Sequence, residues 1–242
     1  FDEKLSTSLD RLFIKKGIVK VNFYDKEISN EFIEVIVVDN ASVDNSVHFI
    51  KKENLKVKII ANKENYGFSK GNNIGVKEAQ GKYVLFLNSD TRIQDKGFLR
   101  MVEFLDLNDR VAILGAKLEN SDKSTQKSAG YFYNVFNLAI LLFGGGKFGF
   151  LRKTPSRISR IDWVSGAALM ARRDIFKKIG GFEEKLFMYM EDMDLCYRAK
   201  KIGINTYVFP RAKALHLHQG SSTRSFAVKH IYKGLLYFYK KN

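Results

Sequence analysis

The chain has one cysteine, Cys196, and two prolines among its 242 residues. A single cysteine excludes an intramolecular disulfide framework and is typical of a reducing compartment. The scarcity of proline and the lack of low-complexity tracts argue against disorder. No apolar run reaches the roughly 20 residues that a membrane-spanning helix needs, and neither a signal peptide nor an internal repeat is recognisable. These absences favour a folded, cytoplasmic protein.

The composition supports one large hydrophobic core, since 45% of the residues are hydrophobic and 13% are aromatic. A single domain of this size is ordinary for α/β folds. The formal charge of +15 suggests an anionic partner, such as nucleic acid, anionic lipid or a phosphorylated substrate. The charges are spread along the chain, so a generally lysine-rich composition explains them equally well. The chain shows no nucleic-acid recognition motif, and we expect no nucleic-acid partner.

Three carboxylates crowd into four residues, 191–194, of the stretch GGFEEKLFMYMEDMDLC (180–196). Glu191, Asp192 and Asp194 repel one another and lie among apolar side chains that limit their hydration. Both effects raise the pKa of a carboxyl group, so we expect a raised pKa for at least one of them, as a general base requires. The alternative is an amphipathic helix that turns its acids to solvent and three residues inward: Met190, Met193 and Tyr197. On this stretch alone the two interpretations are equally good.

Strands and helices alternate through the first half of the chain, which predicts a mostly parallel sheet with helices on both faces, an α/β fold. The second half breaks this rhythm. The expected strands are residues 18–24, 33–38, 57–61, 83–87, 111–114, 161–171 and 204–209, the last closed by Pro210. The expected helices are residues 1–14, 74–79, 97–105, 173–179, 197–202 and 226–239, with another that opens at Ser42; residues 62–73 are expected to form a loop.

Two acids, Asp39 and Asp90, follow predicted strands at the edge where open α/β sheets bind ligands. Each acid alone is more typical of a turn or helix cap. Two of them at equivalent strand ends favour a shared ligand, with one acid accepting from a base or ribose hydroxyl and the other holding a divalent cation. The chain has no P-loop and no GxGxxG motif, so bound phosphates would need a metal ion and basic side chains.

His216 and His218 stand two residues apart after a predicted strand. In an extended segment, this spacing puts both side chains on the same face. The pair precedes a Gly-Ser-Ser loop and suits a metal site or a phosphate donor, although single histidines are usually structural. From the residues alone we leave both interpretations open.

Five segments together resemble the family 2 inverting glycosyltransferases, and in particular their rhamnosyltransferase-like branch. They appear in the order and at the spacing of that family, and the resemblance covers roughly residues 32 to 240. Each segment is a weak indication by itself, whereas the ordered set is specific. The segments are VIVVDNASVDNS (35–46), NYGFSKGNNIGV (65–76), YVLFLNSD (83–90), WVSGAALMARRDIFKKIGGFEEKLFMYMEDMDLCYRAKKIG (163–203) and HLHQGSS (216–222).

The resemblance implies a GT-A fold and a nucleotide-diphosphosugar donor bound with Mg²⁺ or Mn²⁺. It assigns Asp39 to the nucleotide base, and it places Asp90, His216 and His218 at the metal and pyrophosphate. The other donor-binding residues that it implies are Asn65, Gly67, Asn72, Trp163, Ser165 and Gly166. It also implies one domain over residues 1–242, in which residues 1–120 bind the nucleotide, residues 121–222 form the acceptor and catalytic half, and residues 223–242 form a C-terminal helix.

On the catalytic side the resemblance makes Asp192 the base that deprotonates the acceptor hydroxyl, while Glu191 orients the acceptor or the helix. The expected reaction moves a hexose, such as rhamnose, onto a saccharide or lipid-linked acceptor during surface polysaccharide synthesis. We expect Asp194 to be structural and Cys196 to be buried and inert. The alternative function is a catalytically degenerate glycosyltransferase fold that acts as a binding module.

The chain departs from the family pattern in two places. The metal motif runs Asn88-Ser89-Asp90 in place of Asp-x-Asp, so one carboxylate is missing. The first strand of the family, which ends in a Thr-Tyr-Asn-like turn, is absent ahead of Phe1. We therefore expect a chain trimmed at its N-terminus, or one in which residues 18–24 take the place of that strand.

An apolar run at residues 135–143, VFNLAILLF, suggests a peripheral contact with the inner face of the membrane. The run is too short to span a bilayer, and an apolar patch beside basic residues suits an interface that carries a lipid-linked acceptor. The alternative is a helix of the core. The basic residues that follow the run are Arg152, Lys153, Arg157 and Arg160.

Overall fold

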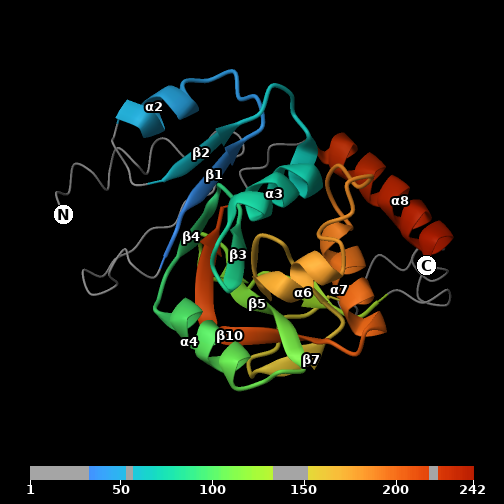
Figure 1. The fold of residues 1–242 in the computed structure, drawn as a ribbon. Coiled ribbons are helices and arrows are strands. Elements are labelled where there is room, and N and C mark those ends of the chain that lie inside the picture. The colour runs from blue at the N-terminus through green and yellow to red at the C-terminus, as the bar shows by residue number, and fades with distance from the viewer. Residues whose placement is uncertain (1–32, 53–56, 133–151, 218–222) are drawn as a thin grey trace.

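The computed structural model describes residues 33–52, 57–132, 152–217 and 223–242, and Figure 1 shows their arrangement. Four expectations from the sequence lie outside these residues. They are the helix at 1–14, the strand at 18–24, the apolar run at 135–143 and the position of His218.

A six-stranded sheet forms the centre of the fold. The strands β5 and β10 are parallel, and the other pairs of this sheet are antiparallel. The prediction of a mostly parallel sheet is therefore wrong, because β9 from the second half of the chain enters between β3 and β5 in the opposite direction. The order is β3 (Tyr83–Leu87), β9 (Ala168–Arg172), β5 (Val111–Glu119), β10 (Asn205–His216) and β4 (Thr91–Ile93), with β7 (Ser159–Ile161) paired to β10.

Two shorter strand pairs accompany this sheet in the described residues. The strands β1 (Ile36–Asp39) and β2 (Lys58–Ala61) are parallel to each other, and β6 (Ala129–Gly130) pairs with β8 (Trp163–Val164). The helix α2 (Ser46–Lys52) packs Ile50 against Val37 of β1 in a small separate core. Asp39 ends β1 and Asp90 follows β3, so the two acids stand at strands of different sheets and not at equivalent strands of one parallel sheet.

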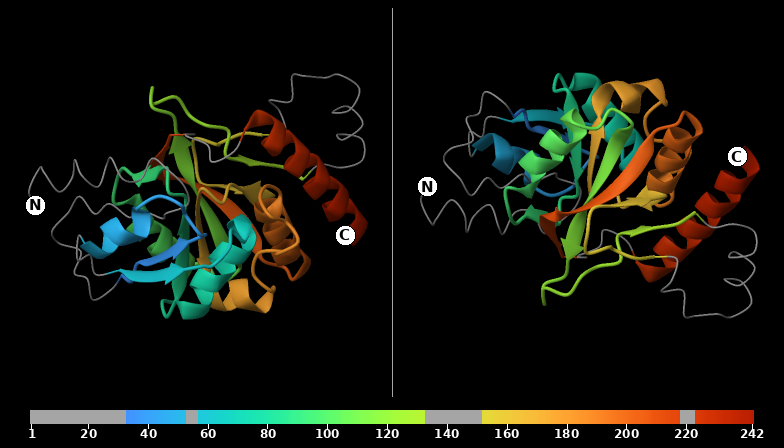
Figure 2. Two further views of the ribbon diagram at one scale, coloured as in Figure 1. Left: turned by 90° about the horizontal axis from the view of Figure 1, so that it is seen from above. Right: turned by 90° about the horizontal axis from the view of Figure 1, so that it is seen from below.

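Helices cover both faces of the central sheet, as the sequence predicts (Figures 1 and 2). Alternate side chains of one strand serve opposite cores: Ile113 belongs to one cluster and Leu114 to the other. The first cluster lies under α3 (Gly67–Glu78), α6 (Arg173–Lys178), α7 (Glu191–Lys201) and α8 (Arg224–Lys241), and the second lies under α4 (Gly97–Asp106).

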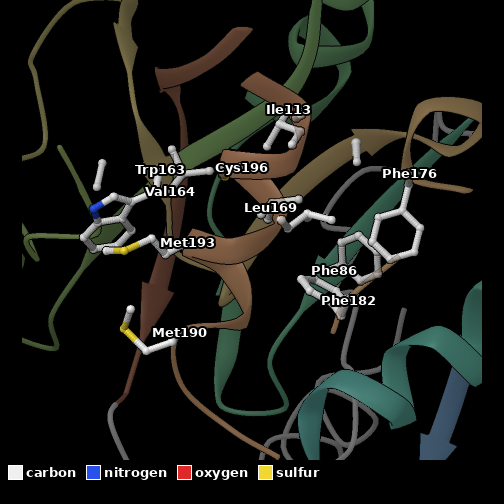
Figure 3. Close-up of a cluster of buried hydrophobic side chains, with 14 of the residues drawn as sticks. Phe86, Ile113, Trp163, Val164, Leu169, Phe176, Phe182, Met190, Met193 and Cys196 are labelled. Atoms are coloured by element: carbon white, nitrogen blue, oxygen red, sulfur yellow. The ribbon is translucent and has the colours of Figure 1, made fainter. Parts of the chain in front are cut away.

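The helix α7 lies directly on the first cluster, and Figure 3 shows Met193 and Cys196 among Trp163, Val164 and Leu169. Burial raises the pKa of the Cys196 thiol to about 12, so the thiol stays protonated and unreactive, as expected. In the described ranges, no helix combines the length and hydrophobicity needed to cross a bilayer.

Several helices begin at residues other than those predicted, α2 and α3 among them. The helix α2 begins at Ser46, where Asp44 accepts from the Ser46 backbone N–H at 3.1 Å, and not at Ser42. The helix α3 begins at Gly67, inside the predicted loop at 62–73. Contacts across the fold override the local composition here, because the Asn73 amide bonds both backbone groups of Phe182, at 2.8 and 2.9 Å.

The strand β10 runs through Pro210, where the sequence predicts its end. Its register against β5 shifts between Phe209 and Lys213, and a proline fits such a bulge because no ladder hydrogen bond is needed from it. The extension has a consequence for the site, because it carries His216 alongside Thr91, the first residue of β4. The predicted strand at 161–171 is likewise divided among β7, β8 and β9.

Candidate active site

The chain enters α7 through two left-handed residues, Tyr189 and Met190, with φ of 71° and 72°. Non-glycine residues rarely adopt this conformation, and such strain persists only where the surroundings hold it. One support is Gly234 of α8, because a Cβ there would lie 2.9 Å from the Met190 Cγ. The close approach of α8 therefore fixes the turn that aims the first residues of α7.

Asp192 is half-buried, and two backbone N–H groups hold its carboxylate. Oδ1 accepts from the N–H of Met193 at 2.7 Å, and Oδ2 accepts from the N–H of Gly166 at 3.3 Å. Burial raises the pKa of Asp192 above its ordinary value, although these N–H groups and the positive charge of Arg152 oppose the rise. The result is an oriented carboxylate that binds a proton more readily than an exposed one does.

Glu191 is more deeply placed, with 6% of its surface exposed. Its Oε2 atom finds no hydrogen-bond partner among the described residues. Burial raises the pKa of Glu191 well above 4.5, and the adjacent charge of Asp192 raises it further. The expected raised pKa is confirmed for both residues, and the alternative of acids turned to solvent is wrong for Glu191.

Asp194 is fully buried and joins three elements. It accepts from Arg198 Nε at 2.7 Å and from Lys241 Nζ at 3.1 Å. Arg198 also donates to the backbone carbonyls of Ile179 and Gly181. Asp194 therefore ties α7 to the preceding loop and to the end of α8, in line with its predicted structural role.

Asp90 and His216 meet at the end of β10. His216 Nε2 lies 3.3 Å from Asp90 Oδ1, and the N–H of Leu217 donates to the Asp90 carbonyl at 2.9 Å. On its other side, His216 Nδ1 lies 3.0 Å from Gln126 Oε1. The Gln126 amide also donates to the His216 carbonyl and to Asn120 Oδ1, both at 2.7 Å. Since Gln126 Oε1 can only accept, Nδ1 of His216 carries a proton toward it, and Nε2 faces Asp90.

This pair fits part of a site for Mg²⁺ or Mn²⁺. Two ligands of one octahedral cation lie about 3 Å apart, close to the spacing of His216 Nε2 and Asp90 Oδ1. The described part of the chain holds no cluster of three or more acidic, histidine or cysteine ligands, and His218 lies outside it. A cation here would need further ligands, which the oxygens of a diphosphate supply.

A short segment joins this pair to the carboxylate on α7. The carbonyl of Ala167 accepts from the N–H of Asn88, which opens the turn that carries Asp90, at 3.0 Å. One residue earlier, Gly166 donates to Asp192. A Cβ at Gly166 would lie 2.9 Å from the tip of the Phe68 ring, so any other residue here would have to displace that ring. The Asp90–His216 pair and the Asp192 carboxylate are thus both anchored to one short segment, through the neighbouring residues Ala167 and Gly166.

The side chains expected at the nucleotide mostly form hydrogen bonds with nearby backbone groups. Asp39 is buried and accepts from the Ser42 N–H at 3.2 Å, which is the turn role left open by the sequence. Asn65 accepts from the Gly67 N–H at 3.0 Å, and Asn72 donates to the Phe68 carbonyl at 2.8 Å.

Gly67 has a φ of 76°, and a Cβ there would lie 2.4 Å from the Phe187 carbonyl oxygen. That oxygen accepts from the Phe68 N–H at 2.8 Å, so Gly67 lets α3 dock on the loop that precedes α7. Two of the remaining expected residues also bond to backbone groups. Trp163 donates to the Tyr131 carbonyl at 3.2 Å, and Ser165 accepts from the Ala167 N–H at 3.3 Å.

Three residues of this region escaped the sequence interpretation. Gln126 has no motif, and Arg152 was considered only for membrane contact, yet Arg152 lies 5.5 Å from the Trp163 ring and within electrostatic range of Asp192. Asn40 donates to the Gly67 carbonyl and accepts from Asn62, both at 2.9 Å, and so joins the ends of β1 and β2 to α3. Only its position next to Asp39 could have drawn attention to it.

The model of the family described as glycosyl transferase family 2 matches residues 22–180. The chain belongs to glycosyl transferase family 2. Its most similar relatives include the rhamnosyltransferase WbbL of Escherichia coli K12, which is 27% identical over 173 residues and 68% of this chain. The low-salt glycan biosynthesis hexosyltransferase Agl10 of Haloferax volcanii is 26% identical over 90% of this chain. The match to family 2 ends before α7.

A third relative is the N-acetylglucosaminyl-diphospho-decaprenol L-rhamnosyltransferase of Mycobacterium tuberculosis (strain H37Rv), 42% identical over 71 residues and 29% of this chain. The chain covers 65% of the length of WbbL, 71% of Agl10 and 23% of the mycobacterial protein. It thus spans slightly less than two thirds of WbbL and a smaller part of the mycobacterial relative.

Solved structures confirm the GT-A fold. The structure of GalNAc-T7 with UDP, GalNAc and Mn²⁺ superposes with a TM-score of 0.60 over 84% of this chain and 41% of that chain, at 14% identity. Residues 1–349 of Staphylococcus aureus TarS in complex with UDP-GlcNAc superpose with a TM-score of 0.59 over 98% of this chain and 62% of that chain, at 19% identity. At these identities the likeness establishes the fold alone.

Proposed function

We propose that this chain transfers a sugar, with inversion, from a nucleotide-diphosphosugar donor to a hydroxyl of a saccharide or lipid-linked acceptor. Membership of family 2 and relatives named as rhamnosyl- and hexosyltransferases support a hexose such as rhamnose as the transferred group. A relative named for a diphospho-decaprenol substrate supports a lipid-linked acceptor. The reaction would then take place in the cytoplasm, at the inner face of the membrane, during surface polysaccharide synthesis.

The observation that carries this proposal is the state of Asp192. A general base must have a pKa nearer to the working pH than an exposed aspartate has, and it must point in a fixed direction. Burial gives Asp192 the first property, and the N–H groups of Met193 and Gly166 give it the second. Asp192 takes the proton of the acceptor hydroxyl as the oxygen attacks the anomeric carbon, and the nucleoside diphosphate leaves from the opposite face.

Asp90 and His216 would hold the divalent cation in this proposal, and the cation would supply positive charge to balance that of the diphosphate. The Gln126 amide keeps His216 in the tautomer that a metal ligand needs. Asp39 contacts the nucleotide base, and Asn65, Gly67, Asn72, Trp163, Ser165 and Gly166 form the wall of the donor pocket. Their hydrogen bonds to backbone support this assignment, because a rigid wall positions a donor without further ordering.

A donor screen tests the proposal. The purified protein is incubated with a panel of UDP-, GDP- and dTDP-sugars, dTDP-rhamnose included, and release of nucleoside diphosphate is followed with Mn²⁺ and with EDTA. We expect slow, metal-dependent hydrolysis of one donor, which a suitable acceptor accelerates. Metal-dependent binding of a nucleoside diphosphate without turnover, with or without acceptor saccharides, would favour the alternative of a binding module. A protein that neither binds nor turns over any donor would refute both.

A further inference from the structure

The outer side of α8 carries an apolar stripe that no described residue covers. Val228, Tyr232 and Leu236 follow one another at intervals of four residues, and 45%, 48% and 73% of their surfaces are exposed. At 100° per residue this spacing places them on one narrow strip of the helix. Most exposed hydrophobic residues on soluble proteins stand singly, so three in a row along one helix require an explanation.

A second stripe of positive charge lies beside the first. Lys229, Lys233 and Lys240 are exposed and, by the same helical spacing, adjoin the apolar strip along one side. The sequence of α8 contains no aspartate or glutamate, and the whole chain has a net charge of +15. An apolar strip bordered by lysines, with no acid in the helix, is complementary to an anionic surface that also has an apolar interior.

The inner side of α8 packs on the segment that leads into the candidate base. The Phe187 ring lies 6.2 Å from Phe226 and 5.7 Å from His230, and Gly234 presses on Met190, two residues before Asp192. Lys241 then ties the end of α8 to Asp194. Whatever the outer side of α8 contacts therefore lies one helix diameter, about 10 Å, from the start of α7.

We propose that the outer side of α8, formed by Val228, Tyr232, Leu236, Lys229, Lys233 and Lys240, binds an anionic lipid bilayer. The apolar side chains enter the headgroup region. A tyrosine is favourable there because its ring lies in the apolar layer while its hydroxyl reaches water. The lysines bind the anionic headgroups. This surface differs from the one suggested by the apolar run at 135–143. The inference rests on the proposed function in one respect, since a lipid-linked acceptor would give the contact its purpose.

The structure favours a bilayer over a protein partner. The strip is convex and narrow, with side chains separated by a full helical turn, whereas a second copy of this helix would bring six lysines together without an acid to pair them. Similar amphipathic helices lie in the plane of the bilayer interface, with lysines at the boundary.

Vesicle flotation without donor or acceptor tests this surface directly, so that its outcome is independent of the proposed activity. We expect the full chain to float at low salt with vesicles that mix phosphatidylcholine and anionic phosphatidylglycerol, and to be released at high salt. Leu236→Asp should weaken binding by at least about tenfold, since a leucine side chain loses its apolar site. The double variant Lys229→Gln, Lys233→Gln should weaken it about 30-fold, at about fivefold per lysine.

Leu107→Asp is the matched control, because Leu107 is 84% exposed and lies at the end of α4, under the opposite face of the sheet. It should bind as the wild type does. Circular dichroism of each variant checks that the fold is retained. The proposal is overturned if the wild type does not float at low salt, if neutral vesicles bind it equally well, or if Leu107→Asp and Leu236→Asp behave alike. A concentration-dependent dimer that Leu236→Asp abolishes, without vesicle binding, would show that a second copy occupies the strip.

Discussion

Replacing Glu191 by glutamine should change how the stability of the protein depends on pH. Glu191 is buried beside Asp192, and both effects raise its pKa above the 4.5 of an exposed glutamate. Between pH 4.5 and the raised pKa, the folded protein holds a proton at this site and the unfolded chain does not. By linkage the free energy of unfolding then falls as the pH rises, by about 1.4 kcal/mol per pH unit. Glutamine has the same shape and does not titrate, so Glu191→Gln should remove this slope.

The assay is urea unfolding of the wild type and of Glu191→Gln at several pH values from 5 to 8. Trp163 reports the transition, because it is the one tryptophan of the chain and is 4% exposed in the folded state. The side-chain amide of glutamine adds donors to a buried position, which costs a constant amount at every pH. The difference in free energy of unfolding between the two proteins should therefore shift in favour of glutamine by about 1.4 kcal/mol for each pH unit within the window.

Glu103→Gln is the control, because Glu103 is an exposed glutamate on α4. Its stability should follow that of the wild type in parallel over the whole pH range. Parallel curves for Glu191→Gln and the wild type from pH 5 to 8 would refute the reasoning. They would mean that the folded protein does not hold an extra proton at Glu191. The argument that burial and the charge of Asp192 raise the pKa of Glu191 would then be wrong.

Three further predictions concern the chemistry of the site. Asp192→Asn should lower turnover by roughly 10²–10⁴-fold and leave the affinity for the donor nearly unchanged, as steady-state kinetics and calorimetry can show; full turnover in this variant, with loss in Glu191→Gln, would reverse the two roles. Asp90→Asn should weaken binding of the nucleoside diphosphate and blunt its Mn²⁺ dependence, and equal wild-type affinities in EDTA and Mn²⁺ would contradict the metal assignment. Gln126→Leu should shift the imidazole tautomer of His216, visible in nitrogen NMR, and lower Mn²⁺ affinity by about 10–100-fold; an unchanged tautomer would count against Gln126 as the residue that sets it.

Local sequence patterns predicted the elements whose residues decide their own structure. The strand at 83–87 has the predicted bounds, and the helix at 97–105 differs by one residue, since apolar runs and helical periodicity are local properties. The sheet order is not local. Nothing in the sequence near Ala168–Arg172 says that this strand runs antiparallel between β3 and β5, and the alternation of elements in the first half suggested a parallel sheet.

The candidate site shows the same division. The crowding of acids at 191–194 is visible in the sequence and predicted a raised pKa. The structure confirms a raised pKa for Glu191 and Asp192. The partner of His216 on its Nδ1 side, Gln126, is 90 residues away and belongs to no motif, so only the fold reveals it. Pro210 misled the prediction for a related reason, since a proline ends a regular strand but fits a bulge that only the pairing with β5 makes evident.

The separation of β1, α2 and β2 from the central sheet bears on the cost of binding a nucleotide. Among the described residues their core has two buried hydrophobic side chains, Val37 and Ile50, and it is distinct from the two large clusters. A unit with so few buried contacts opens by itself at a lower free energy than the rest, so its amide hydrogens should exchange sooner than those of β5. A nucleotide that contacts Asp39 can bind only when this unit is closed. The observed affinity is therefore the affinity of the closed form multiplied by the fraction of molecules that are closed, and bound nucleotide should slow the amide exchange of the unit.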